Sequence, residues 1–147
     1  MSNFPITKTI LGIGAGILVG YLVWRVLPDY LGKKKEDPRS KEYLTRIAAE
    51  INRSVPMMID KETELLPSVG EPGMLIYNYR LVSFSAAQIE PERFTAAAKQ
   101  QVTQGACGRA ETRDGFLKKG VMLRYSYYDK DKQHIATVDV TPADCGF

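Results

Sequence analysis

The residues of this 147-residue chain best suited to chemistry are its two cysteines and its single histidine. Cys107, Cys145 and His134 are too few to form a plausible zinc site. The cysteines are therefore either unrelated thiols in a reducing compartment or one disulfide that pins the C-terminal tail to the element carrying Cys107. We favour the disulfide, which by the chain-entropy estimate would stabilise a small domain by about 4 kcal/mol.

The remaining residues do not suggest a set of side chains for acid–base or nucleophilic catalysis. His134 lies beside the charged segment 129–132, where a solvated histidine is typical. Asp60, Glu62 and Glu64 alternate along the chain, a pattern that could hold a cation but more often marks the solvated side of a bend or an edge strand. We therefore predict no catalytic residue, no metal and no cofactor, and keep an enzyme only as an alternative.

The basic character of the chain is confined to its N-terminal third. Of the net charge of +3, residues 1–32 contribute +1, residues 33–46 contribute +3, and the remainder contributes −1. A nucleic-acid surface would need lysine and arginine clustered on the folded domain itself. We therefore predict no nucleic-acid binding and assign the basic run to the edge of a membrane.

The basic run follows an apolar stretch that contains no charged residue, residues 9–24. Extended to Leu27 by letting Arg25 snorkel, it approaches the ~20 residues that cross a bilayer. No small-x-small cleavage site follows it, which favours a retained anchor over a signal peptide. Membrane lipid is thus one expected partner, and the residues expected at the interface are Tyr21, Trp24, Arg25, Tyr30, Lys33, Lys34 and Lys35.

Within the predicted span, three glycines recur every four residues: Gly12, Gly16 and Gly20. This spacing places them on one helix face, where a second helix can approach closely. The face predicts packing either with a second copy of the chain or with a larger inner-membrane complex.

The rest of the chain predicts helices and strands in an order typical of one α+β domain. Asp37 is the expected N-cap of a helix with Pro38 at its first position, and Pro56 ends it. The other expected elements are extended segments at 57–59 and 65–66, the longest strand at 74–84, helices at 91–107 and 109–118, and strands at 121–128 and 135–140. We predict a small antiparallel sheet covered by helices on one side.

The chain thus divides into a transmembrane anchor at 1–32, a basic linker at 33–39 and a soluble domain at 40–147. Alternation in the strands places Tyr77 and Tyr79 on one face of the first, and Tyr125 and Tyr127 on one face of the second. These four tyrosines are candidates for a partner surface, since tyrosine is favoured at interfaces, although ordinary sheet packing would also account for them.

Several segments of this domain together resemble small bacterial envelope proteins and the α/β pilotin lipoproteins of type II secretion. They are Leu75–Tyr79, the helix ending in Cys107, Gly120–Tyr125, Asp129 in the hairpin turn, and Val138–Cys145. The resemblance implies an α+β fold with a Cys107–Cys145 disulfide in the periplasm. A pilotin is lipid-anchored through an N-terminal cysteine and binds a secretin tail, whereas this chain has no lipobox cysteine and carries a predicted span.

Two arguments about membrane orientation conflict. The basic residues after the span favour a cytoplasmic domain by the positive-inside rule. The cysteine pair and the resemblance favour a periplasmic domain on a single-pass inner-membrane protein, which is our prediction. The expected function is a membrane-tethered, non-enzymatic binding or scaffold module whose partner is another membrane or envelope protein. The alternative is an accessory subunit packed through the glycine face.

Overall fold

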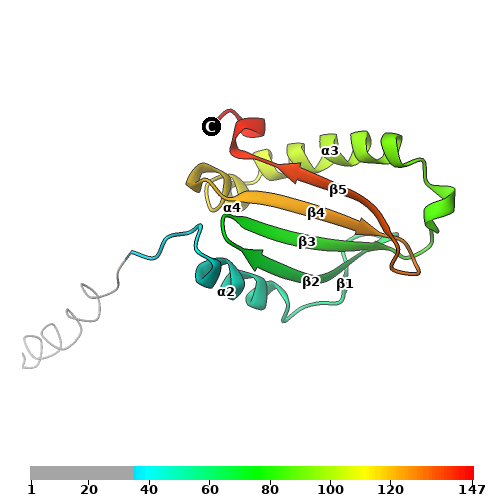
Figure 1. Ribbon diagram of the computed structural model, residues 1–147, viewed down its shortest axis with the longest axis horizontal. Coiled ribbons are helices and arrows are strands. Elements are labelled where there is room, and N and C mark those ends of the chain that lie inside the picture. The colour runs from blue at the N-terminus through cyan, green and yellow to red at the C-terminus, as the bar shows by residue number, and fades with distance from the viewer. Residues whose placement is uncertain (1–34) are drawn as a thin grey trace, which may run out of the picture. The chain divides into compact units, whose positions relative to one another are not determined.

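The computed structural model describes residues 35–147 (Figure 1). The predicted anchor, its glycine face and the interface residues Tyr21 to Lys34 lie outside this range. Lys35 is described and is exposed. Within residues 35–147, no helix combines the length and the apolar character needed to cross a bilayer.

Five strands form one sheet in the order of the chain, from β1 to β5. The bounds of the elements are α2 Lys41–Ile51, β1 Met57–Met58, β2 Thr63–Glu71, β3 Met74–Leu81, α3 Pro91–Gly108, α4 Ala110–Arg113, β4 Met122–Tyr128 and β5 His134–Val140. Short 3₁₀ turns cover Ala86–Gln88, Leu117–Lys119 and Pro142–Cys145. The predicted α+β class is confirmed.

The prediction of a fully antiparallel sheet is wrong at its centre. β3 and β4 pair in parallel, with Tyr77 opposite Tyr125 and Tyr79 opposite Tyr127, whereas the other three pairings are antiparallel. A parallel pair needs a crossover connection, and α3 provides it. In the chain, α3 lies between β3 and β4. In space it runs back along the sheet and packs mainly against β5 (Figure 1).

Helix α2 begins later and ends earlier than the sequence suggested. Ser40, not Asp37, is its N-cap, because the Ser40 hydroxyl accepts a hydrogen bond from the Tyr43 amide at 3.2 Å. The Asp37 carboxylate instead accepts from the Arg39 amide in the preceding turn. The helix stops at Ile51, before Pro56, and the Asn52 side chain then bonds to both backbone groups of Ser68.

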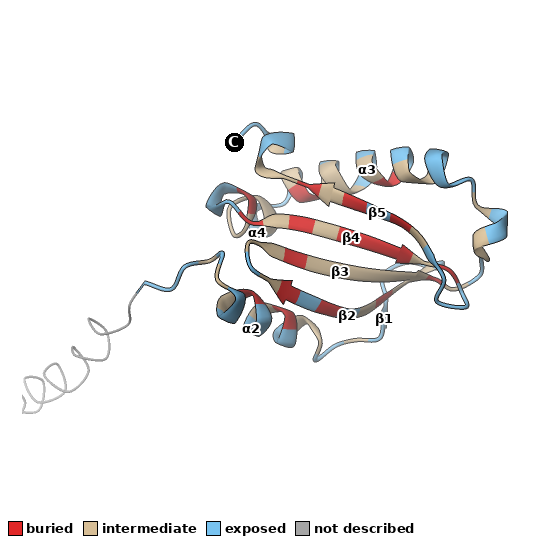
Figure 2. Ribbon diagram, in the orientation of Figure 1, coloured by how far each residue is buried: buried red, intermediate tan, exposed pale blue. Residues whose placement is uncertain are grey.

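Helices α2 and α3 cover the same face of the sheet. Gly70 of β2 lies against the backbone of α2, and it pairs with Leu75, whose side chain is in the core. Figure 2 shows buried segments on strands β2 to β5 and on both helices. The fully buried side chains of this core include Leu44, Leu75, Leu117, Val121, Leu123 and Val140. The prediction of helices on one side is confirmed.

Two expected features lie where the sequence placed them. Gly120 has a φ of 81° and ends the 3₁₀ turn that precedes β4. The helix expected at 109–118 is instead divided into α4 and this 3₁₀ turn. Asp129 is buried in the β4–β5 turn, where its carboxylate accepts hydrogen bonds from the amides of Ala86, Asp131 and Gln133. The charged hairpin turn is therefore held by a buried acid.

Candidate functional site

Four tyrosines form a continuous floor on the helix-covered face of the sheet. The Tyr77 and Tyr125 rings are 5.4 Å apart between centroids, the Tyr79 and Tyr127 rings 5.5 Å, and the diagonal pair Tyr79 and Tyr125 6.1 Å. The parallel register of β3 and β4 sets these neighbours opposite one another. The structure thus brings together the four tyrosines that the sequence offered as a partner surface.

This floor is the bottom of a groove of about 490 Å³. One wall is the inner face of α3, and the other is the segment joining β1 to β2. Besides the tyrosines and Leu81 of the floor, the lining residues are Ile59, Asp60, Thr63, Phe94, Ala97, Ala98, Gln101, Val102, Gly105, Ala106, Arg109 and Thr112. The groove is therefore mainly apolar, with a few polar groups along it, as ligand sites commonly are.

Small residues on α3 keep the groove open. On the wall that faces the tyrosines, Ala97 lies about two turns before Gly105, and Ala98 lies about two turns before Ala106. A Cβ added at Gly105 would meet no atom within 4 Å. Larger side chains at these positions would fill the space above the floor, so the groove is a consequence of side-chain size on α3.

The tyrosine hydroxyls have no hydrogen-bond partner within residues 35–147. Burial raises the pKa of Tyr77 to about 12 and is also the main cause that raises the pKa of Tyr127 to about 12. Burial likewise raises the pKa of Tyr79 and Tyr125, with a further contribution from the neighbouring tyrosines. The floor therefore presents four neutral hydroxyl groups, and buried tyrosines usually pair such groups.

Two charged side chains line the groove at different places. The Asp60 carboxylate accepts hydrogen bonds from the amides of Glu62 and Thr63, both at 2.8 Å, so it holds its own turn. Arg109, the residue that ends α3, is exposed and makes no ion pair within residues 35–147. The cation is thus the charged group of the groove that is available to a ligand.

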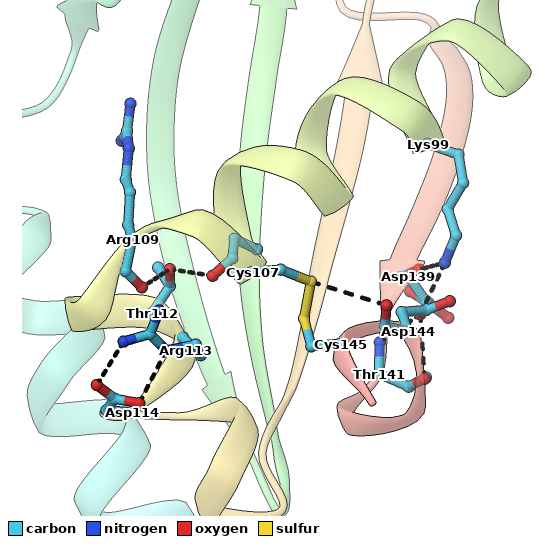
Figure 3. The surroundings of a disulfide bond; sticks show 11 residues. Lys99, Cys107, Arg109, Thr112, Arg113, Asp114, Asp139, Thr141, Asp144 and Cys145 are labelled. Atoms are coloured by element: carbon cyan, nitrogen blue, oxygen red, sulfur yellow. Dashed lines mark hydrogen bonds and ion pairs between the residues drawn. A yellow bond between two sulfur atoms is a disulfide. The ribbon is translucent and has the colours of Figure 1, made fainter. Parts of the chain in front are cut away.

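A disulfide between Cys107 and Cys145 joins the C-terminal tail to α3 (Figure 3). The two Cα atoms are 5.4 Å apart. Close to it, the Lys99 ammonium contacts the Asp144 carboxylate at 2.8 Å, and the same carboxylate accepts from the Thr141 amide at 2.7 Å. The tail therefore attaches to the groove wall both covalently and by an ion pair.

The remaining residues considered for chemistry are dispersed. His134 is exposed and its ring contacts the Thr137 hydroxyl at 2.8 Å. Glu64 pairs with Arg80 on the opposite sheet face, away from Asp60. Among residues 35–147 no cluster of three histidine, cysteine or acidic side chains could hold a metal ion.

Sequence reasoning missed several residues of the groove. Arg109 had no pattern to mark it, because its role depends on where α3 ends relative to the tyrosines. The small residues of α3 were visible as a helical stripe, and this stripe could have indicated an open wall opposite the aromatic floor. Ile59 was assigned to a short extended segment, with no sign that it would line a groove.

No protein-family model matches the chain, and no curated protein matches it. Among solved structures, a Pseudomonas aeruginosa protein classed provisionally as secreted shares 21% identity at a TM-score of 0.60, over 71% of this chain and 91% of that one. The pilotin EpsS of the Vibrio vulnificus type 2 secretion system shares 16% at 0.59, over 73% and 92%. The type II secretion pilotin AspS of Vibrio cholerae shares 14% at 0.56, over 71% and 91%.

Identities this low establish similarity of fold alone. The similarity extends over nearly the whole length of each of the three proteins. The described domain therefore resembles the α+β fold of the type II secretion pilotins.

Proposed function

We propose that this chain is a membrane-tethered, non-enzymatic binding module of the bacterial envelope, and that its tyrosine-floored groove holds a segment of a partner protein. The observation that carries the proposal is the open groove above Tyr77, Tyr79, Tyr125 and Tyr127. Its floor offers large rigid rings with free hydroxyls, a combination that favours protein interfaces. The fold shared with two secretion-system pilotins supports a partner in the envelope.

The lining chemistry favours binding over catalysis. The one carboxylate of the lining, Asp60, already accepts two backbone hydrogen bonds, and the tyrosines have raised pKa values that keep them protonated. The groove can therefore supply shape, apolar contact and hydrogen-bond donors. Packing through Gly12, Gly16 and Gly20 remains a prediction for the segment outside the described residues.

Filling the groove should abolish partner binding without unfolding the domain. A Gly105→Phe side chain would project into empty space in the groove, and replacing a helical glycine stabilises α3 by up to about 1 kcal/mol. A photo-crosslinking amino acid is placed at position 59, and the protein is irradiated in native membranes. We expect a crosslinked partner when the rest of the chain is wild type. The yield should fall at least tenfold in Gly105→Phe.

Gly108→Phe is the matched control. Gly108 belongs to the same helix, and its added Cβ also meets no atom within 4 Å, but it does not line the groove. This variant should crosslink as the wild type does. Equal yields from both variants would rule out the groove as the binding site.

The proposed tether and orientation can be tested through the cysteines. In intact cells, a membrane-impermeant maleimide should modify Cys107 and Cys145 only after a reductant has opened their disulfide, because an oxidising periplasm keeps the bond closed. The protein should also resist extraction from membranes by alkaline carbonate. Rapid labelling by a permeant reagent without reductant would contradict the periplasmic location.

A further inference from the structure

Resting on the groove function proposed above, we propose that the partner segment is apolar and carries an internal aspartate or glutamate, held by the Arg109 guanidinium and by the hydroxyls of Tyr79 and Tyr125. The proposal thus assigns a carboxylate subsite to the middle of the groove.

Arg109 differs from the other arginines of residues 35–147. Arg39, Arg53, Arg80, Arg93, Arg113 and Arg124 each pair with a carboxylate, and Arg46 lies over the Tyr43 ring. The Arg109 guanidinium has neither kind of partner in that range. Arginine presents five donors in a planar fork that matches a carboxylate, so its unpaired charge at a binding groove indicates an anionic ligand group.

Arg109 lines the same groove as the four tyrosines. Its positive charge opposes the burial effect on the pKa of Tyr79 and Tyr125, whereas neither Tyr77 nor Tyr127 is affected in this way. Figure 3 shows the Arg109 side chain extending from the end of α3 away from the disulfide. Arg109 thus shares one groove with Tyr79 and Tyr125, whose rings are neighbours at 6.1 Å, and its charge acts on both of them.

The hydroxyls complete the subsite. A carboxylate has about four acceptor positions, and the guanidinium together with two phenol donors can satisfy them. Without a ligand, these hydroxyls have no hydrogen-bond partner within residues 35–147. A carboxylate at this point would pair groups that the fold itself leaves unpaired, through charge-assisted hydrogen bonds, which are stronger than neutral ones.

An acidic side chain fits the subsite better than a chain terminus. The Tyr79–Tyr125 pair has lining neighbours on both strands: Tyr77 adjoins Tyr125, and Tyr127 adjoins Tyr79 and the Phe94 ring. Ala106 of α3, three residues before Arg109, also lines the groove. A bound segment can therefore contact apolar residues before and after its carboxylate. Asp60 contributes a negative charge near Tyr127, so a second acid at that end is disfavoured.

A peptide selection tests this subsite with the full-length protein in detergent micelles. Random 16-residue peptides on phage are selected on the wild type and counter-selected on Gly105→Phe, which removes binders outside the groove. We expect the surviving peptides to share an aspartate or glutamate among apolar residues. As synthetic peptides, their affinity should fall at least tenfold when the acid is changed to its amide, and should not change when the C-terminus is amidated.

The Arg109→Gln variant tests the role of the charge directly. It should fold as the wild type does, because the Arg109 side chain makes no contact on which folding depends. It should bind the acidic and amide peptides equally well, and Arg109→Glu should select peptides with lysine or arginine at that position. Groove-specific peptides without an acid, or with an essential C-terminal carboxylate, would overturn the subsite while leaving the groove function standing. Failure to select any groove-specific peptide would overturn both.

Discussion

Replacing Gly70 with alanine should destabilise the domain by about 3 kcal/mol, a large loss for a single methyl group. Gly70 is the point at which α2 rests directly on β2, and a Cβ there would overlap the backbone of Leu44 and Thr45. Because the obstacle is helix backbone and not a flexible side chain, α2 must move away from the sheet as a whole. That movement would expose Leu44 and Ala48, which are buried in the core.

Denaturation by urea, followed by circular dichroism, measures this effect. Gly105→Ala is the matched control, because its added methyl group meets open space and should raise stability slightly. A Gly70→Ala variant within about 0.5 kcal/mol of the wild type would mean that α2 does not depend on this close approach.

Sequence reasoning located well the two strands that form a local hairpin, β4 and β5. β4 and β5 alternate clearly and are joined by a turn with Asp129, and both lie close to their predicted bounds. The start of α3 at Pro91 follows from proline at a first helical position. In these elements the chain neighbours decide the conformation, so a single sequence carries enough information.

β2 was recognised only in part, because it contains residues that disfavour strands. Pro67 and Gly70 interrupt it, and its register with β3 shifts between Leu66 and Val69. Distant side chains replace the missing ladder bonds: Asn52 bonds to Ser68, and the Asn78 amide donates to the Pro67 carbonyl at 2.7 Å. Such compensation depends on the tertiary fold and has no local pattern.

The candidate site was predictable as a surface but not as a groove. Alternation alone places Tyr77 with Tyr79, and Tyr125 with Tyr127, on single strand faces. That the two pairs adjoin depends on the parallel pairing of β3 and β4, which the position of α3 determines. The depth of the site and the place of Arg109 follow from the same helix, so the groove could be inferred only after the crossover was known.

The tail that holds α3 in place has few apolar contacts of its own. Phe147 is exposed, and no residue of the Pro142–Cys145 turn is buried. The attachment therefore depends on the Cys107–Cys145 bond, on the pairing of Lys99 with Asp144, and on contact between the Lys118 ammonium and the Phe147 ring. Exposed ion pairs contribute little, so the covalent bond should dominate.

Removing the disulfide by Cys107→Ser and Cys145→Ser together should cost about 4 kcal/mol of stability, because the bond closes a loop with a sequence separation of 38. Urea denaturation of the wild type with and without reductant should show the same difference, whereas the double variant should not respond to reductant. Limited proteolysis should then cleave the tail first, with the core of Leu75 and Leu123 still protected. Identical denaturation midpoints for the oxidised and reduced wild type would show that the ion pair and apolar packing hold α3 without the bond, and the groove would then not depend on an oxidising compartment.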